Sequence, residues 1–212
     1  GSIRIPAGFT GVFGIKPSFG RIPAYPQGNY GNIAHPGPLT RTVTDAALVL
    51  TAIAAPDPRD SQALPPDDRD YRVGLQDGVR GLRVAYSATL GYVEVDSEIA
   101  ALVDRAVEVF VELGAVVEEV DPGFASPRDL FARFWEAGAA SLVEALPRGA
   151  REDMEPGLLA IAEAGRALSA LDMVVADRQR GDLIRHMNRF HQTYDLLLTP
   201  TLPLPAFPAG QD

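Results

Sequence analysis

The sequence predicts an α/β protein in which helices cover a mixed β-sheet, and two features carry this prediction. A strand–helix–strand unit spans residues 82–120, and a short apolar strand near residue 196 follows a long helical region. Strand–helix–strand units form parallel strand pairs through a right-handed crossover, so the unit indicates a layered α/β fold. No internal repeat is visible in the sequence.

Composition and charge narrow the class of protein. Of the 212 residues, 46 % are apolar and 22 % are charged, which is usual for a globular domain. No apolar run is long enough to cross a bilayer, and there is no cysteine for disulfides, thiolate catalysis or cysteine-bound zinc. The net charge of −9 disfavours contact with nucleic acid or an anionic membrane. We therefore expect a cytoplasmic protein that contacts neither nucleic acid nor a membrane, and a homodimer stays open.

The first third of the chain is predicted to contain loops around one helix. Residues 1–38 are dense in glycine and proline, which indicates loops and tight turns. A helix is expected from Val43 to Ala54, with Thr42 as its N-cap and Asp45 as the capping-box partner. Residues 56–70 are polar and rich in proline, as is typical of a surface excursion, and their aspartates lack the spacing of a calcium-binding loop.

The strand–helix–strand unit follows this excursion. Leu82 to Tyr86 is predicted to be a strand, and apolar residues at helical spacing predict a helix from Ser97 to Leu113. Asp96 or Ser97 is the expected N-cap, and Gly114 stands where a C-terminal glycine is favoured. Ala115 to Val120 is the second predicted strand.

The region from Pro127 to His191 is predicted to be almost entirely helical. Breaks are expected near Pro147, near Pro156 and at Ser169-Ala170. A buried strand then runs from Asp195 to Thr199 and is stopped by a proline. One of the helices carries three aromatic residues, and a core-facing position is the default interpretation for them; they are Phe131, Phe134 and Trp135.

Four sequence blocks carry a family resemblance. They are Gly1-Ser2-Ile3-Arg4-Ile5-Pro6-Ala7, the G-x-x-G-I-K-P-S-x-G-R-I-P run of residues 11–23, GPLTRTVTDAA at 37–47 and YDLLLTPT at 194–201. In this order they resemble the amidase signature family, with Thr40 in the place of the usual alanine. The resemblance covers nearly the whole chain.

The resemblance implies a fold and a mechanism. The fold would be the layered amidase-signature type, of which these residues form an incomplete part: a signature core (1–55), a linker (56–80) and an α/β portion with a helical substrate side (81–212). The activity would be hydrolysis of non-peptide amide bonds in a small-molecule substrate, through an acyl-enzyme and without a metal or cofactor. Ser2 would be the nucleophile, and the N–H groups of Gly1 and Ser2 would form the oxyanion hole.

The family's remaining catalytic residues are a serine in a cis peptide and an unprotonated lysine. Both precede the Gly-Ser-Ile-Arg block in the family, so we expect the 212 residues alone to be inactive, with exposed sheet edges and apolar surfaces flanking Ser2 and Thr199. An inactive fragment or scaffold is the first alternative. An amidotransferase component of a transamidating complex that acts on charged tRNA is the second, although the acidic charge disfavours contact with nucleic acid.

The other residues with reactive or charged side chains are interpreted as non-catalytic. Lys16, the single lysine, is expected to have a structural or surface role, and Arg4 and Arg21 to pair internally with acids or backbone carbonyls. No histidine is expected to form a triad with the nucleophile; the three are His35, His186 and His191. The aromatic helix has a second interpretation through the resemblance, as a border of the acyl pocket.

Overall fold

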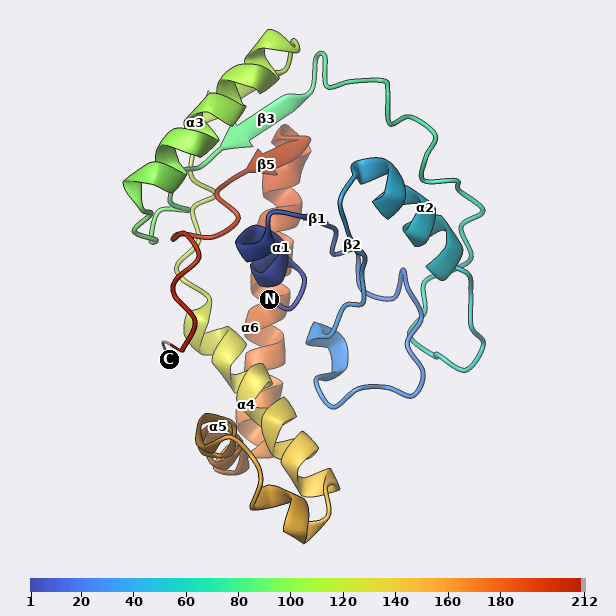
Figure 1. Ribbon diagram of the computed structural model, residues 1–212, viewed down its shortest axis with the longest axis vertical. Helices are drawn as coiled ribbons and strands as arrows, with labels where there is room; N and C mark the ends of the chain where they lie inside the picture. The colour runs from blue at the N-terminus through green and yellow to red at the C-terminus, as the bar shows by residue number, and fades with distance from the viewer. Residues whose placement is uncertain (211–212) are drawn as a thin grey trace.

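The computed structural model describes residues 1–210 and contains two small sheets among six α-helices (Figure 1). The α/β class predicted from the sequence is confirmed. The last two positions of the expected 81–212 portion lie outside the described residues. In chain order the elements are α1 (Arg4–Thr10), β1 (Phe13–Gly14), a 3-10 turn (Gly31–Ile33), β2 (Leu39–Thr40), α2 (Val43–Ile53), β3 (Arg83–Tyr86), α3 (Ser97–Glu112), β4 (Val116–Glu119), α4 (Arg128–Ala145), a second 3-10 turn (Arg148–Arg151), α5 (Pro156–Arg166), α6 (Ala170–Thr193) and β5 (Leu196–Leu198).

The larger sheet is parallel and has β3 at its centre. Strands β4 and β5 flank β3, so that Val84 lies opposite Val117 on one side and Leu196 on the other. Val84 and Ala85 are both 0 % exposed, which makes β3 the most deeply buried strand of this sheet. The predicted strand–helix–strand unit and the third strand are therefore confirmed. The expectation that the third strand is buried is wrong, because β5 lies at the edge of the sheet and Leu196 is 40 % exposed. Antiparallel pairing occurs in the separate β1–β2 sheet.

Helix α3 connects β3 to β4 and is held by a cap and a polar contact. Asp96 accepts a hydrogen bond from the Glu98 N–H at 2.8 Å, as expected of an N-cap. Gly114 follows the helix at a φ of +90°, which an L side chain rarely adopts. The Tyr86 hydroxyl on β3 donates to Asp104 on α3 at 2.6 Å. This bond ties the helix to the sheet.

Helices α4 and α5 pack closely against each other. Their contact is centred on the buried side chains of Ala139, Val143 and Ala162. Gly165 permits this approach, because a Cβ at that position would overlap the backbone carbonyl of Glu136 on α4. Residues with little or no side chain therefore set the distance between these two helices.

The breaks predicted in the helical region are confirmed. The Glu155 carboxylate accepts from the N–H groups of Gly157 and Leu158, both at 2.9 Å, at the start of α5. Ser169 and Asp172 form a reciprocal capping box at the start of α6. At both helix starts, side chains therefore accept hydrogen bonds from backbone N–H groups that have no partner within the helix.

Helix α1 was not predicted, and the expectation of loops and turns is wrong for this part of residues 1–38. Pro6 lies in the first turn, where its missing N–H leaves no helical bond unmade. Gly11 ends the helix at a φ of +67° and donates its N–H to the Ala7 carbonyl. Seven residues are too few for a stable isolated helix. Distant packing supports it, including an edge-to-face contact of Phe9 with Phe207 at 5.4 Å.

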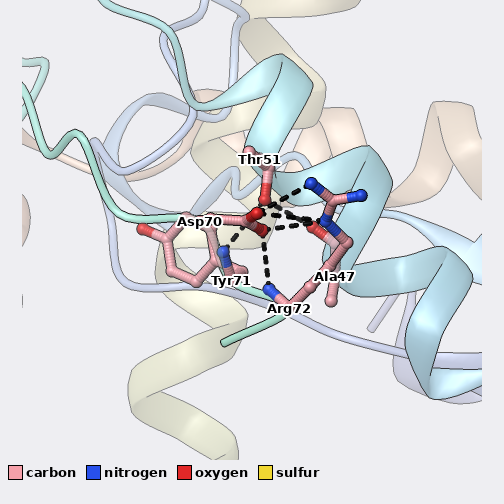
Figure 2. A network of polar contacts seen from close by, with 5 residues as sticks. All are labelled: Ala47, Thr51, Asp70, Tyr71 and Arg72. Atoms are coloured by element: carbon pink, nitrogen blue, oxygen red, sulfur yellow. Dashed lines mark hydrogen bonds and ion pairs between the residues drawn. The ribbon is translucent and has the colours of Figure 1, made fainter. Parts of the chain in front are cut away.

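Helix α2 begins at its predicted cap, where the Thr42 hydroxyl accepts from the Asp45 N–H at 3.0 Å. Residues 54–82 contain no regular helix or strand and fold back onto α2. Figure 2 shows that contact: the Tyr71 N–H donates to the Thr51 hydroxyl at 3.0 Å, and Thr51 donates to the Ala47 carbonyl at 2.8 Å. These bonds hold the segment against the helix.

Three aspartates of this segment, Asp57, Asp67 and Asp70, pair with arginines. Asp57 pairs with Arg59 and Asp70 with Arg72, both at 2.7 Å. Within residues 1–210, no group of three or more histidine, aspartate or glutamate side chains could hold a metal ion. Among the same residues, every helix is too short or too polar to cross a membrane.

The chain has a large surface for its mass. Its solvent-accessible area is 13959 Å², whereas a compact monomer of 22.7 kDa would have roughly 9,500 Å². Large apolar side chains are exposed near both Ser2 and Thr199, as expected, and on the flanking strands of the parallel sheet; examples are Ile5, Val116, Leu196, Leu204 and Phe207. Much of this surface is thus suited to further packing.

Candidate functional site

Ser2 lies directly ahead of α1 and is exposed. The turn that presents it is closed by the Ile5 N–H, which donates to the Gly1 carbonyl at 2.9 Å. Both Gly1 and Ser2 line a cavity of about 540 Å³, a size within the range of small-molecule sites. The predicted nucleophile therefore has access to a space that a substrate could occupy.

The helix behind Ser2 is braced by the segment after β5. The Arg4 guanidinium donates to the Thr201 carbonyl at 2.9 Å, which confirms the expected role of Arg4 as a partner of a backbone carbonyl. Gly8 faces Leu202 so closely that a Cβ would lie 2.8 Å from a Leu202 methyl group. The first and last of the four sequence blocks therefore meet in the structure.

Three basic side chains line the same cavity as Ser2, and two of them, Lys16 and His35, have a shifted pKa. Partial burial of its ammonium group lowers the pKa of Lys16, an otherwise exposed residue whose Nζ donates to the Pro17 carbonyl at 3.2 Å. Burial is also the main cause that lowers the pKa of His35, and the charges of Lys16 and Arg180 add to it, whereas a hydrogen bond with the Ile33 carbonyl opposes it. Both shifts favour the neutral form, which is the form that can accept a proton.

The imidazole of His35 is oriented by its neighbours. Its Nδ1 lies 3.1 Å from the Ile33 carbonyl, so that the proton belongs on Nδ1 and Nε2 is the proton acceptor. The sequence places no nucleophile beside His35, but the structure brings His35 and Ser2 to one cavity. Among residues 1–210 no hydrogen bond joins the two side chains, so they do not form a dyad here.

Three aromatic residues also line the cavity. Phe131 and Trp135 come from α4, and Tyr30 comes from the loop before β2. The rings of Tyr30 and Trp135 stack at 4.7 Å, and those of Phe131 and Trp135 at 6.0 Å. The default interpretation of a core-facing aromatic helix is therefore wrong for Phe131 and Trp135, because they face the cavity; Phe131 is 48 % exposed.

Sequence reasoning did not single out Tyr30. Its only local signal is an aromatic residue within a loop rich in glycine and asparagine. The position of this loop is set by contacts from other elements: Ser141 of α4 donates to the Asn29 side chain at 3.2 Å, and Arg180 of α6 donates to the Asn32 carbonyl at 3.2 Å. Such long-range contacts leave no mark in the local sequence.

The remaining candidate residues lie away from Ser2's cavity. Arg21 donates to the Pro65 carbonyl at 3.5 Å and pairs with Asp67 at 3.6 Å, which confirms its internal role. His186 bonds the Pro122 carbonyl at 2.6 Å, and His191 bonds the Tyr194 carbonyl at 3.1 Å. The oxyanion-hole role of the Gly1 and Ser2 N–H groups stays a prediction.

The comparisons with known proteins agree on one family. The protein-family model described as Amidase matches residues 1–212. An acylamidase from Rhodococcus erythropolis is 36 % identical over 214 residues, which cover all of this chain and 45 % of that protein. A glutamyl-tRNA(Gln) amidotransferase subunit from Trichlorobacter lovleyi is 31 % identical, covering all of this chain and 49 % of that protein.

The solved structures give the same result. A bacterial aryl acylamidase of the amidase signature family superposes with a TM-score of 0.84 at 31 % identity, and the match covers 99 % of this chain and 46 % of that structure. A crystal structure of an amidase superposes with a TM-score of 0.78 at 30 % identity, covering all of this chain and 45 % of that structure. The chain thus spans about half the length of the proteins it matches.

Proposed function

Because this chain belongs to the amidase family, we propose that it supplies the nucleophile Ser2 to a serine amidase that acts on small amides. The observation that carries the proposal is the position of Ser2 at the wall of a cavity of about 540 Å³, beside a stack of aromatic rings. The named activities of the relatives, acylamidase and aryl acylamidase, support an amide with an aromatic group as the first substrate to test.

The proposed reaction has two steps. The Ser2 oxygen attacks the amide carbonyl carbon, the C–N bond breaks, and the serine proton passes through a base to the departing amine. Water then attacks the acyl ester, which releases the carboxylic acid and restores the serine hydroxyl. The N–H groups of Gly1 and Ser2 are the proposed donors to the oxyanion that forms in each step.

The mechanism also needs a base that accepts the proton of Ser2. In the family's block order, the catalytic lysine and the bridging serine precede the block that contains Ser2, so we propose that the complete protein supplies both outside these 212 residues. Lys16 and His35 are the competing bases, because both line the cavity and burial favours their neutral forms. On the proposal, neither one takes the proton of Ser2.

A role in a tRNA-dependent amidotransferase is the second candidate function, and the identity to a glutamyl-tRNA(Gln) amidotransferase protein favours it. The net charge of −9 opposes direct contact of this chain with tRNA. We therefore place hydrolysis of a small amide first. A cytoplasmic location and a homodimer are further proposals, consistent with the absence of cysteine and with the exposed apolar side chains.

Hydrolysis of 4-nitroacetanilide by the complete protein tests this proposal. Ser2→Ala should lower kcat by several orders of magnitude, as is usual for loss of a nucleophile. Ser18→Ala is the matched control, because Ser18 is an exposed serine of the same segment that does not line the cavity. Equal activity of Ser2→Ala and the wild type would exclude Ser2 as the nucleophile.

The same assay identifies the base. Lys16→Met and His35→Gln should each keep kcat within about tenfold of the wild type, because neither is the proposed proton acceptor. A loss in either variant as large as that of Ser2→Ala would assign the base to that residue and refute the proposed origin of the base.

A further inference from the structure

A second cavity lies next to the cavity of Ser2. It has a volume of about 340 Å³, and Tyr30 lines both cavities. No acidic or basic side chain lines this second cavity. Its lining includes neutral polar and apolar side chains, among them Gln27, Asn29, Asn32, Gln62, Phe134 and Met173. By contrast, Arg4 and Lys16 line the cavity of Ser2.

Tyr30 is held in place from two directions. Its ring stacks on Trp135 at 4.7 Å with an interplanar angle of 24°. Its other neighbour is Gly138, one turn further along α4, where an added Cβ would lie 2.8 Å from the Tyr30 Cε1 and closer still to Cδ1. The tyrosine ring therefore occupies the space that any side chain at position 138 would need.

The loop that carries Tyr30 is also fixed on both sides of the ring. Ser141 bonds Asn29 before it, and Arg180 bonds the carbonyl of Asn32 after it. Nearer the start of the loop, the Gln27 amide donates to the Gln62 side-chain carbonyl. A loop anchored by α4, α6 and residue 62 can hold the Tyr30 ring where it discriminates by shape, because the loop cannot move aside without breaking these contacts.

We propose that Tyr30 is the specificity-determining wall between the two cavities and limits how far a substrate extends from Ser2. This inference rests on the proposed function. The second cavity then takes the distal end of longer amides once the ring is removed. The carboxamide side chains favour an uncharged, hydrogen-bonding end over a carboxylate, because among its lining residues no cation would pair with the charge.

Two substrate series test this inference in the complete protein. One series extends the acyl group of a 4-nitroanilide from acetyl to octanoyl, and the other keeps acetyl and extends the amine. Tyr30→Ala should raise kcat/KM for the longest member relative to the shortest by about tenfold or more in at least one series, since a single methylene can change discrimination tenfold in a fitted pocket.

Matched variants distinguish the effect of the Tyr30 ring from the effects of its hydroxyl and of the surrounding loop. Tyr30→Phe keeps the ring and should retain the wild-type length profile, whereas Gly138→Ala displaces the ring and should broaden it. Tyr25→Ala changes another tyrosine of the same loop, which is 59 % exposed and lines neither cavity, and should change nothing. Among the longest substrates, Tyr30→Ala should show a higher kcat/KM for one that ends in a carboxamide than for the isosteric one that ends in a carboxylate.

Binding gives a readout that does not depend on turnover. Trp135 is the only tryptophan of these residues and stacks on Tyr30, so bound 4-nitroanilides should quench its fluorescence. Trp135→Phe identifies its share of the signal, and a Ser2→Ala background prevents hydrolysis. If no amide is hydrolysed, the proposed function fails and this titration alone decides the inference. An affinity profile over substrate length that is the same with and without Tyr30→Ala would overturn it.

Discussion

The guanidinium of Arg4 donates to the backbone carbonyl of Thr201 at 2.9 Å, across 197 positions of sequence. Arg4 stands two residues after Ser2, and Thr201 follows the last strand, β5. The bond therefore fixes the helix behind the proposed nucleophile to the end of the parallel sheet. Since the bond lies in the block that contains Ser2, its loss should affect activity as well as stability.

Arg4→Ala should lower the free energy of unfolding by about 1 kcal/mol, because the donor is charged but the bond is exposed. It should also lower kcat/KM by freeing the turn before α1. Chemical denaturation and amide hydrolysis measure the two effects. Arg41→Ala is the control, because Arg41 is exposed and bonds no other side chain among residues 1–210; equal effects of both substitutions would contradict this role of Arg4.

Gly165→Ala should destabilise the protein by about 1–3 kcal/mol through overpacking, because the new Cβ would overlap the Glu136 carbonyl. Gly181→Ala is the matched change in helix α6, where the nearest atom outside the helix backbone, an Arg185 nitrogen, lies 3.5 Å away. That variant should be about 0.5–1 kcal/mol more stable than the wild type, since alanine favours the helix. Urea unfolding distinguishes them, and a stabilised Gly165→Ala would refute the close approach of α4 and α5.

The stability at high pH should depend on Tyr86. Burial, with the hydrogen bond to Asp104 as a second cause, raises the pKa of Tyr86 to about 12 from 10.0. Because the folded value lies above the unfolded one, this contribution is complete below pH 10 and is lost as the pH rises through 12. Tyr86→Phe should therefore be less stable at pH 8 and should lose less stability between pH 10 and 12. Parallel curves for both proteins in that range would contradict the buried hydroxyl.

The stability at low pH should depend on His35. Burial, the largest cause, lowers the pKa of His35 below its ordinary 6.5. Since the folded value lies below the unfolded one, the contribution to stability is present above pH 6.5 and is lost as the pH falls through the folded pKa. A proton NMR titration should show a midpoint below 6.5, and His35→Gln should weaken the loss of stability on acidification. A midpoint above 6.5 would place His35 outside the cavity.

Much of the fold followed from local sequence, and the exceptions share a physical cause. The strand centred on Val84 and the capped helices were predictable, because periodicity and caps are local signals. Helix α1 was not, since its support comes from Thr201 and Phe207 near the other end of the chain. The convergence of Tyr30 and Trp135 on the cavity of Ser2 likewise arises from packing between distant segments.

The proposed role of Ser2 as an activated nucleophile in the complete protein can be tested by covalent labelling. A fluorophosphonate reacts with such a serine because its adduct mimics the tetrahedral state of acyl transfer. Mass spectrometry of the labelled and digested protein measures the site directly. We predict a single adduct on the peptide that contains Ser2, lost in Ser2→Ala and retained in Ser18→Ala. An adduct on Ser18, Ser87 or Ser141 in place of Ser2 would contradict the proposed role.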